Sequence, residues 1–170
     1  MKIKKGYWIW GLFPYQETNL LNEIKAIVQS KLESPVFETH ITLTGPYLNI
    51  DKSFLNKLKN FGKSNSQINL NVDGYDFKKE IFKSFYISIK NSRNLKELRK
   101  NIYELNQYDS GNNYSPHISL SYGSHNIKAK IKLITKLPEF NKPIKMSKIA
   151  IVEVNEDINL WKILEIIDLN

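Results

Sequence analysis

Hydrophobic and polar residues alternate in several short segments of the chain, whereas other segments carry hydrophobic residues three or four positions apart. The first spacing is typical of β-strands and the second of amphipathic helices, because side chains alternate across a strand and return to one face of a helix about every turn. The alternating segments predict strands at 7–12, 37–44, 68–77, 81–90, 114–122, 149–154 and 160–167. The helical spacing predicts helices at 18–32, 51–61, 92–105 and 127–137.

Capping and turn residues separate these elements. Thr18 is expected to cap the first helix, and Gly62 is expected to end the second. Gly45-Pro46 is expected to end the strand at 37–44. The segment 78–80 predicts a hairpin tip, and the polar segment 109–113 predicts a turn before the strand at 114–122.

The order of these elements repeats along the chain. A strand, a helix, a strand and a helix are followed by two strands, a helix, a strand and a helix, and two strands close the chain. This repetition predicts an α+β fold in which two pseudo-symmetric lobes of antiparallel sheet plus helices face a central cleft. No segment rich in proline, glycine or serine divides the halves, so we expect residues 1–170 to form a single bilobal domain.

Each repeat carries a copy of one motif, His-x-(Ser/Thr)-x-(Ser/Thr). The copies are His40–Thr44 and His117–Ser121, and the chain has only 3 histidines, so two matches are not expected by chance. In an extended strand the first, third and fifth residues share one face. The histidine and both hydroxyls of each motif are therefore expected to point one way, with the isoleucine and leucine between them pointing into a core.

A pair of histidines suits acid–base chemistry near neutral pH, because imidazole titrates there. In phosphodiester hydrolysis one histidine would take a proton from the attacking water, and the other would protonate the departing sugar oxygen. The hydroxyls of Thr42 and Ser119 would donate hydrogen bonds to the non-bridging phosphate oxygens. We therefore predict that His40, His117, Thr42 and Ser119 are catalytic. No metal or cofactor is expected, and the acidic residues form no cluster typical of a two-metal nuclease.

Composition narrows the class of protein further. A hydrophobic content of 41% with 12% aromatic residues indicates a globular chain, and the absence of cysteine excludes disulfides, thiolate nucleophiles and cysteine-based zinc sites. The net charge of +8 would attract anions, but the lysines are scattered, so we expect mostly solvated faces and no dedicated groove. The apolar run at 7–13 is too short for a signal peptide, and no segment is long enough to span a bilayer. We expect a cytoplasmic protein that does not bind membranes.

The paired motifs resemble those of the 2H phosphoesterase superfamily over essentially the whole chain. That superfamily includes RNA 2',3'-cyclic phosphodiesterases, cyclic phosphodiesterases of tRNA splicing and phosphodiesterases of 2'-5' oligoadenylates. The resemblance implies that His40 and His117 form the acid–base pair and that Thr42 and Ser119 hold the phosphate. The aromatic first strand and the segment Pro116–Tyr122 are most similar to the cyclic phosphodiesterase branch. The implied substrate is a 2',3'-cyclic nucleotide, an ADP-ribose 1'',2''-cyclic phosphate or an RNA 2',3'-cyclic phosphate end. We separately expect a monomer without an obligate protein partner.

Several alternatives stay open on sequence alone. The substrate could instead be a 2'-5' oligoadenylate or a cyclic oligonucleotide messenger, or the chain could bind a nucleotide or RNA end without turning it over. His125 lies outside both motifs and is expected in a surface loop. Further residues are candidates for contacts to the substrate, with a purely structural role as the other reading of each: Thr44, Ser121, Tyr122, Trp8 and Trp10.

Overall fold

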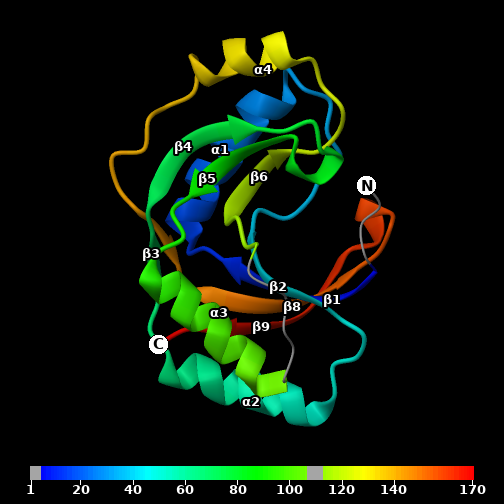
Figure 1. Cartoon of the computed structure of the whole chain (residues 1–170), viewed down its shortest axis with the longest axis vertical. Coiled ribbons are helices and arrows are strands. Elements are labelled where there is room, and N and C mark those ends of the chain that lie inside the picture. The colour runs from blue at the N-terminus through cyan, green and yellow to red at the C-terminus, as the bar shows by residue number, and fades with distance from the viewer. Residues whose placement is uncertain (1–4, 107–112) are drawn as a thin grey trace.

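The computed structural model describes residues 5–106 and 113–170 (Figure 1). Its strands are β1 (Gly6–Leu12), β2 (Ile41–Tyr47), β3 (Ile68–Leu70), β4 (Val72–Phe77), β5 (Phe85–Ile89), β6 (His117–Ser121), β7 (Ile144–Met146), β8 (Lys148–Val154) and β9 (Lys162–Asp168). Its helices are α1 (Tyr15–Gln29), α2 (Lys52–Ser64), α3 (Arg93–Asn106) and α4 (Ile127–Ile134), with short 3-10 turns η1 (Ile81–Lys83) and η2 (Ile158–Leu160). The predicted α+β class is confirmed.

One antiparallel sheet of seven strands organises the molecule, in the order β4-β5-β6-β2-β1-β8-β9, and β3 pairs with β7 in a separate two-stranded sheet. The two motif strands, β2 and β6, are neighbours at the centre of the large sheet, where Ile41 pairs with Ile118. The halves β4-β5-β6 and β2-β1-β8-β9 therefore meet at the two motifs.

Helices cover the sheet in a crossed arrangement. Helix α1 leads from β1 to β2 but packs on β6, whereas α3 leads from β5 to β6 and packs on β2. Figure 1 shows α1 and α4 beside the β4–β6 half, with α2 and α3 beside the other half. The main core lies between the helices and the sheet and includes the isoleucine and leucine of both motifs. A smaller cluster contains Trp10, Leu12, Ala150, Val152 and Val154, with Trp8, Trp161 and Ile163 packed against it.

Several predicted boundaries are wrong for identifiable reasons. Helix α1 begins at Tyr15 with Pro14 in the N-cap position, so Thr18 lies inside the helix and is not its cap. The Thr18 hydroxyl donates to the carbonyl oxygen of Phe13 at 3.1 Å. Gly62 does not end α2, which continues to Ser64; a Cβ at Gly62 would lie 2.5 Å from an atom of Ile167, so glycine allows β9 to approach the helix.

The first motif strand is also displaced from its prediction. It begins at Ile41, so His40 directly precedes it, and it runs through Gly45-Pro46 to Tyr47. Gly45 has a φ of 132°, and a Cβ there would lie 2.8 Å from the Trp8 ring, which explains glycine within a strand. The strand predicted at 68–77 is divided between β3 and β4, which belong to different sheets. Most of the turn predicted at 109–113 lies outside the described residues.

Candidate active site

Both motif histidines are held by the same local hydrogen bond. Nδ1 of His40 donates to the carbonyl oxygen of Glu38 at 2.7 Å, and Nδ1 of His117 donates to the carbonyl oxygen of Ser115 at 2.9 Å. A carbonyl oxygen only accepts, so Nδ1 carries the proton in each neutral ring and Nε2 is left as the basic nitrogen. The fold thus presents two imidazoles in the same tautomer, related by the repeat.

Strand pairing brings the two histidines together. Ile41 and Ile118 face each other across β2 and β6, and both are fully buried in the main core. The residues on either side of a buried strand residue point to the opposite face of the sheet. His40 and Thr42 therefore share that opposite face with His117 and Ser119. The four predicted catalytic residues lie on one face at the centre of the sheet.

In each motif strand, a shift in the pairing register turns the fifth residue of the motif away from this face. Along β1 and β2, Trp10 pairs with Thr42 but Ile9 pairs with Thr44, so Leu43 is an extra residue. Along β5 and β6, the extra residue is Leu120, and Ser121 pairs with the buried Phe85. An extra residue of this kind changes the side of the sheet to which the following side chain points.

Thr44 and Ser121 consequently lie on the core side of the sheet. Thr44 is 3% exposed, with its hydroxyl 3.2 Å from the hydroxyl of Tyr47, and Ser121 is fully buried. The expectation that all three polar residues of each motif share a face is therefore wrong for the fifth position. The structure does not place these two hydroxyls beside the histidines.

Aromatic rings surround His40. The Trp10 ring stacks on the imidazole at 3.5 Å between centroids and an angle of 6°, and the Trp161 ring lies 6.5 Å away at 71°. Burial lowers the pKa of His40 from 6.5 to about 3; its backbone hydrogen bond opposes this shift, and the charges of His117 and Lys25 add to it. The imidazole is therefore held neutral in the unliganded protein.

His117 has a different environment. The Tyr86 ring meets it at 5.2 Å and 63°, and the Lys83 ammonium lies 4.8 Å from the centre of that Tyr86 ring. Burial lowers the pKa of His117 from 6.5 to about 4; its backbone hydrogen bond opposes the shift, and the charges of Lys83 and Lys78 add to it. Two tryptophan rings thus adjoin His40, whereas one tyrosine ring adjoins His117 and two lysines act on its charge.

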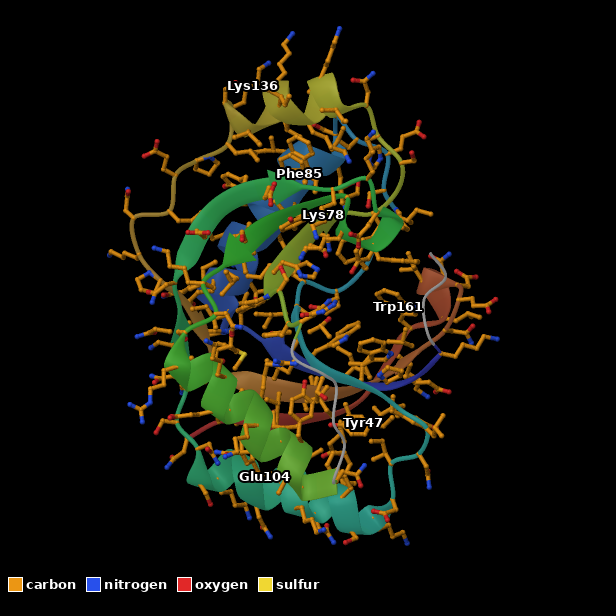
Figure 2. The ribbon with its side chains drawn as sticks, in the orientation of Figure 1. Tyr47, Lys78, Phe85, Glu104, Lys136 and Trp161 are labelled. Atoms are coloured by element: carbon orange, nitrogen blue, oxygen red, sulfur yellow. The ribbon has the colours of Figure 1, made fainter. Side chains whose placement is uncertain are left out.

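Two aromatic residues connect the motifs to the β8–β9 hairpin. Tyr122 stacks on Phe37 at 4.0 Å, meets Trp161 at 6.0 Å and forms a side-chain hydrogen bond with Ser119. Trp161 follows η2 and is fixed by donation from Nε1 to the carbonyl oxygen of Asn155 at 2.8 Å. Figure 2 shows Trp161 on this hairpin. Its half-buried ring makes Trp161 a candidate surface for a nucleobase, which sequence reasoning missed.

The remaining residues singled out from the sequence are Trp10, Trp8 and His125, and each has a different environment. Trp10 is 2% exposed and covers His40, so its ring serves the histidine and leaves little surface for a base. Trp8 is half-buried in the same smaller cluster. His125 links two segments, with Nδ1 3.0 Å from the Ser84 hydroxyl and Nε2 2.5 Å from the carbonyl oxygen of Glu33.

Within the ranges 5–106 and 113–170, no three His, Asp or Glu side chains come together as a set of metal ligands. The helices in those ranges include none with the length and apolar character to cross a membrane.

Comparisons with known proteins show the family and the fold. The model of a family described as the 2'-5' RNA ligase superfamily matches residues 15–157. A search of curated proteins finds no match. Escherichia coli LigT in its apo form has a similar fold, with a TM-score of 0.67 and 13% identity over 98% of both chains. The protein TT0787 of Thermus thermophilus has a TM-score of 0.62 and 14% identity over 96% of this chain and 97% of that one. A structure named as a phosphoesterase has a TM-score of 0.56 and 10% identity over 98% of this chain and 99% of that one.

Proposed function

The chain belongs to the 2'-5' RNA ligase superfamily, and on that premise we propose that it is a phosphodiesterase that hydrolyses a cyclic phosphodiester to a phosphomonoester. The proposed substrates carry a 2',3'-cyclic phosphate, on a nucleotide or an RNA end, or the 1'',2''-cyclic phosphate of ADP-ribose. The observation that carries the proposal is the matched pair of imidazoles. Both have Nδ1 engaged by a backbone carbonyl and Nε2 available, on one face of adjacent strands.

The proposed reaction needs one neutral and one protonated imidazole. The neutral Nε2 takes a proton from water as the water oxygen forms a bond to phosphorus. The bond between phosphorus and one ribose oxygen breaks, and the second imidazole gives its Nε2 proton to that oxygen. Thr42 and Ser119 donate hydrogen bonds to the non-bridging oxygens, where negative charge accumulates. The reaction is balanced in protons, because the neutral histidine gains one proton from water and the protonated histidine loses one to the ribose oxygen.

A panel of substrates tests the proposal. Purified protein would be incubated with 2',3'-cyclic AMP, ADP-ribose 1'',2''-cyclic phosphate, a 2'-5' oligoadenylate and a cyclic oligonucleotide, and the products separated by chromatography. We expect monoester products from a 2',3'- or 1'',2''-cyclic phosphate. Binding without turnover of any of them would show a nucleotide-binding protein instead, and cleavage of the oligoadenylate alone would assign the other substrate class.

Two histidine variants test the mechanism, and a third serves as their control. His40→Ala and His117→Ala should each reduce turnover by a factor of about a hundred to ten thousand, the range for a positioned acid or base. His125→Gln is the matched control, because His125 lies outside both motifs and its two ring nitrogens bond to Ser84 and to the carbonyl oxygen of Glu33, so this variant should retain near-normal turnover. Near-normal turnover in a folded His40 or His117 variant would contradict the paired mechanism.

A further inference from the structure

A buried lysine lies beside His117. Lys83 ends η1 and is 8% exposed, and its ammonium donates to the Ser115 hydroxyl at 2.7 Å. The backbone carbonyl of Ser115 is the one that holds His117. Lys83 also lies over the ring of Tyr86, which itself meets His117. Tyr86 pairs with Ser119 across β5 and β6, so the Lys83 ammonium lies on the face of the sheet that carries the motif histidines.

Lys83 forms no ion pair within the described part of the chain. The nearby Asp76 accepts a hydrogen bond from the Tyr86 hydroxyl at 2.7 Å, and Glu80 pairs with Lys78 at 3.7 Å. No described carboxylate forms an ion pair with Lys83, and Ser115 is the one described hydrogen-bond acceptor of its ammonium. Burial lowers the pKa of Lys83, and the charge of Lys78 lowers it further, whereas the charges of Glu80 and Asp76 oppose the shift without reversing it. An ammonium that is largely removed from water and bonded to no carboxylate is unfavourable, so an anion in contact with it would be stabilised.

The buried lysine on the His40 side of the site, Lys25, is held in a different way. Lys25 is also buried, but its ammonium donates to the carbonyl oxygen of Phe37 and lies 3.6 Å from the centre of the Phe37 ring. Lys25 therefore fixes the segment that leads to His40. Figure 2 shows the contrast between the halves, with Lys78 in the β4–β6 half and Trp161 on the β8–β9 hairpin of the other half.

We propose that Lys83, with Lys78 beside it, forms a subsite for a second anionic group of the substrate, next to the cyclic phosphodiester held at His40 and His117. This inference rests on the proposed function. On a nucleoside 2',3'-cyclic phosphate, the other anionic group is the phosphoryl group on the 5' oxygen. The substrate class is therefore a 2',3'-cyclic nucleotide that carries a 5'-phosphoryl group, either as a free nucleotide or as the last residue of an RNA chain.

Binding of two unreactive nucleotides tests the subsite without turnover. Calorimetry on the full chain would compare adenosine 3',5'-bisphosphate with 3'-AMP, which lacks the 5'-phosphoryl group. A charge-assisted hydrogen bond should make the bisphosphate bind at least about tenfold more tightly to the wild type. We expect Lys83→Gln to reduce this ratio to about threefold or less and Lys83→Arg to keep it. Lys63→Gln removes the same charge from the exposed end of α2 and should leave the ratio unchanged.

Equal binding of the two nucleotides by the wild type, or an unchanged ratio in folded Lys83→Gln, would overturn the subsite. Because these ligands are not substrates, the result is independent of whether the protein hydrolyses anything. A turnover arm compares 2',3'-cyclic AMP with its 5'-phosphorylated form and with a dinucleotide that ends in a 2',3'-cyclic phosphate. A higher kcat/KM for the 5'-phosphorylated cyclic nucleotide supports a free nucleotide as the substrate. A higher kcat/KM for the dinucleotide supports an RNA end. No preference over 2',3'-cyclic AMP contradicts the subsite, whereas no hydrolysis at all contradicts the proposed function.

Discussion

The pH dependence of hydrolysis should differ between the free protein and its substrate complex. Burial lowers the pKa of His40 to about 3 and that of His117 to about 4 in the free protein. The residue with the higher pKa is the more easily protonated, so we expect His117 to be the acid and His40 the base. With a pKa of about 4, only roughly one His117 ring in a thousand is protonated at pH 7. The free protein is therefore mostly in an inactive protonation state at neutral pH.

A bound phosphodiester changes this balance because it brings a negative charge between the rings. At about 4 Å and an effective dielectric constant of about 20, that charge favours the protonated imidazole by about 4 kcal/mol. Since one pH unit corresponds to about 1.4 kcal/mol, the pKa of His117 in the complex rises by roughly three units, to about 7. The sign follows from the charges: an anion stabilises the imidazolium, so the alkaline limb moves to higher pH.

Steady-state kinetics from pH 5 to 8 can follow the ionisation of His117 in both states of the protein. The pH dependence of kcat/KM reports pKa values in the free protein, and that of kcat reports pKa values in the substrate complex. We expect kcat/KM to fall about tenfold per pH unit across this range. The same bound charge raises the pKa of His40 in the complex to about 6, so we expect kcat to rise from pH 5, to peak between about pH 6 and pH 7 and to fall at higher pH. In the His117→Ala variant the residual alkaline dependence should disappear. A kcat/KM that is level or rises from pH 5 to 8 would refute both the burial argument and the assignment of His117 as the acid.

Three further outcomes follow from the site. Thr42→Ala should reduce turnover at least about tenfold, whereas Thr44→Val, on the core side, should keep normal turnover and lose about 1 kcal/mol of unfolding free energy in urea titration. Trp161→Ala should raise KM about five- to hundredfold with a smaller change in kcat, as expected for a base-stacking ring, and Leu160→Ala on the same exposed turn should change neither. Turnover should persist in EDTA, because the two histidines supply both proton transfers; loss on chelation with rescue by a divalent ion would contradict this.

Local sequence patterns predicted the parts of this fold that depend on local geometry. Alternation located the motif strands, and helical spacing located the four helices of the described residues, because both patterns arise from the direction of side chains along one element. The repeated motif identified His40, His117, Thr42 and Ser119, which the structure brings to one face. The similarity of the two halves also survives in detail, since both histidines have the same tautomer and both motifs contain the same extra leucine.

The features that the sequence did not reveal depend on partners far along the chain. Alternation within β2 or β6 cannot show an extra residue, because it exists only relative to the pairing strand; Thr44 and Ser121 were misplaced for that reason. Trp161 contacts His40 through the fold and not through any motif, and Lys83 lies next to a hairpin tip with ordinary local composition. The near-neutral titration expected of imidazole likewise changes on folding, because burial is its main determinant here.

The symmetry of the repeat and its departures have separate consequences for the site. The shared hydrogen bond and register shift give two equivalent Nε2 atoms, and equivalent groups cannot by themselves decide which end of a substrate faces which histidine. The surroundings differ, because Trp10 and Trp161 adjoin His40 whereas Lys83 and Lys78 affect His117. A nucleotide has the same asymmetry, with an apolar base at one end and charged phosphoryl groups at the other. When the asymmetry of the nucleotide is matched to that of the site, the base lies toward the β8–β9 hairpin and the second phosphoryl group lies toward η1.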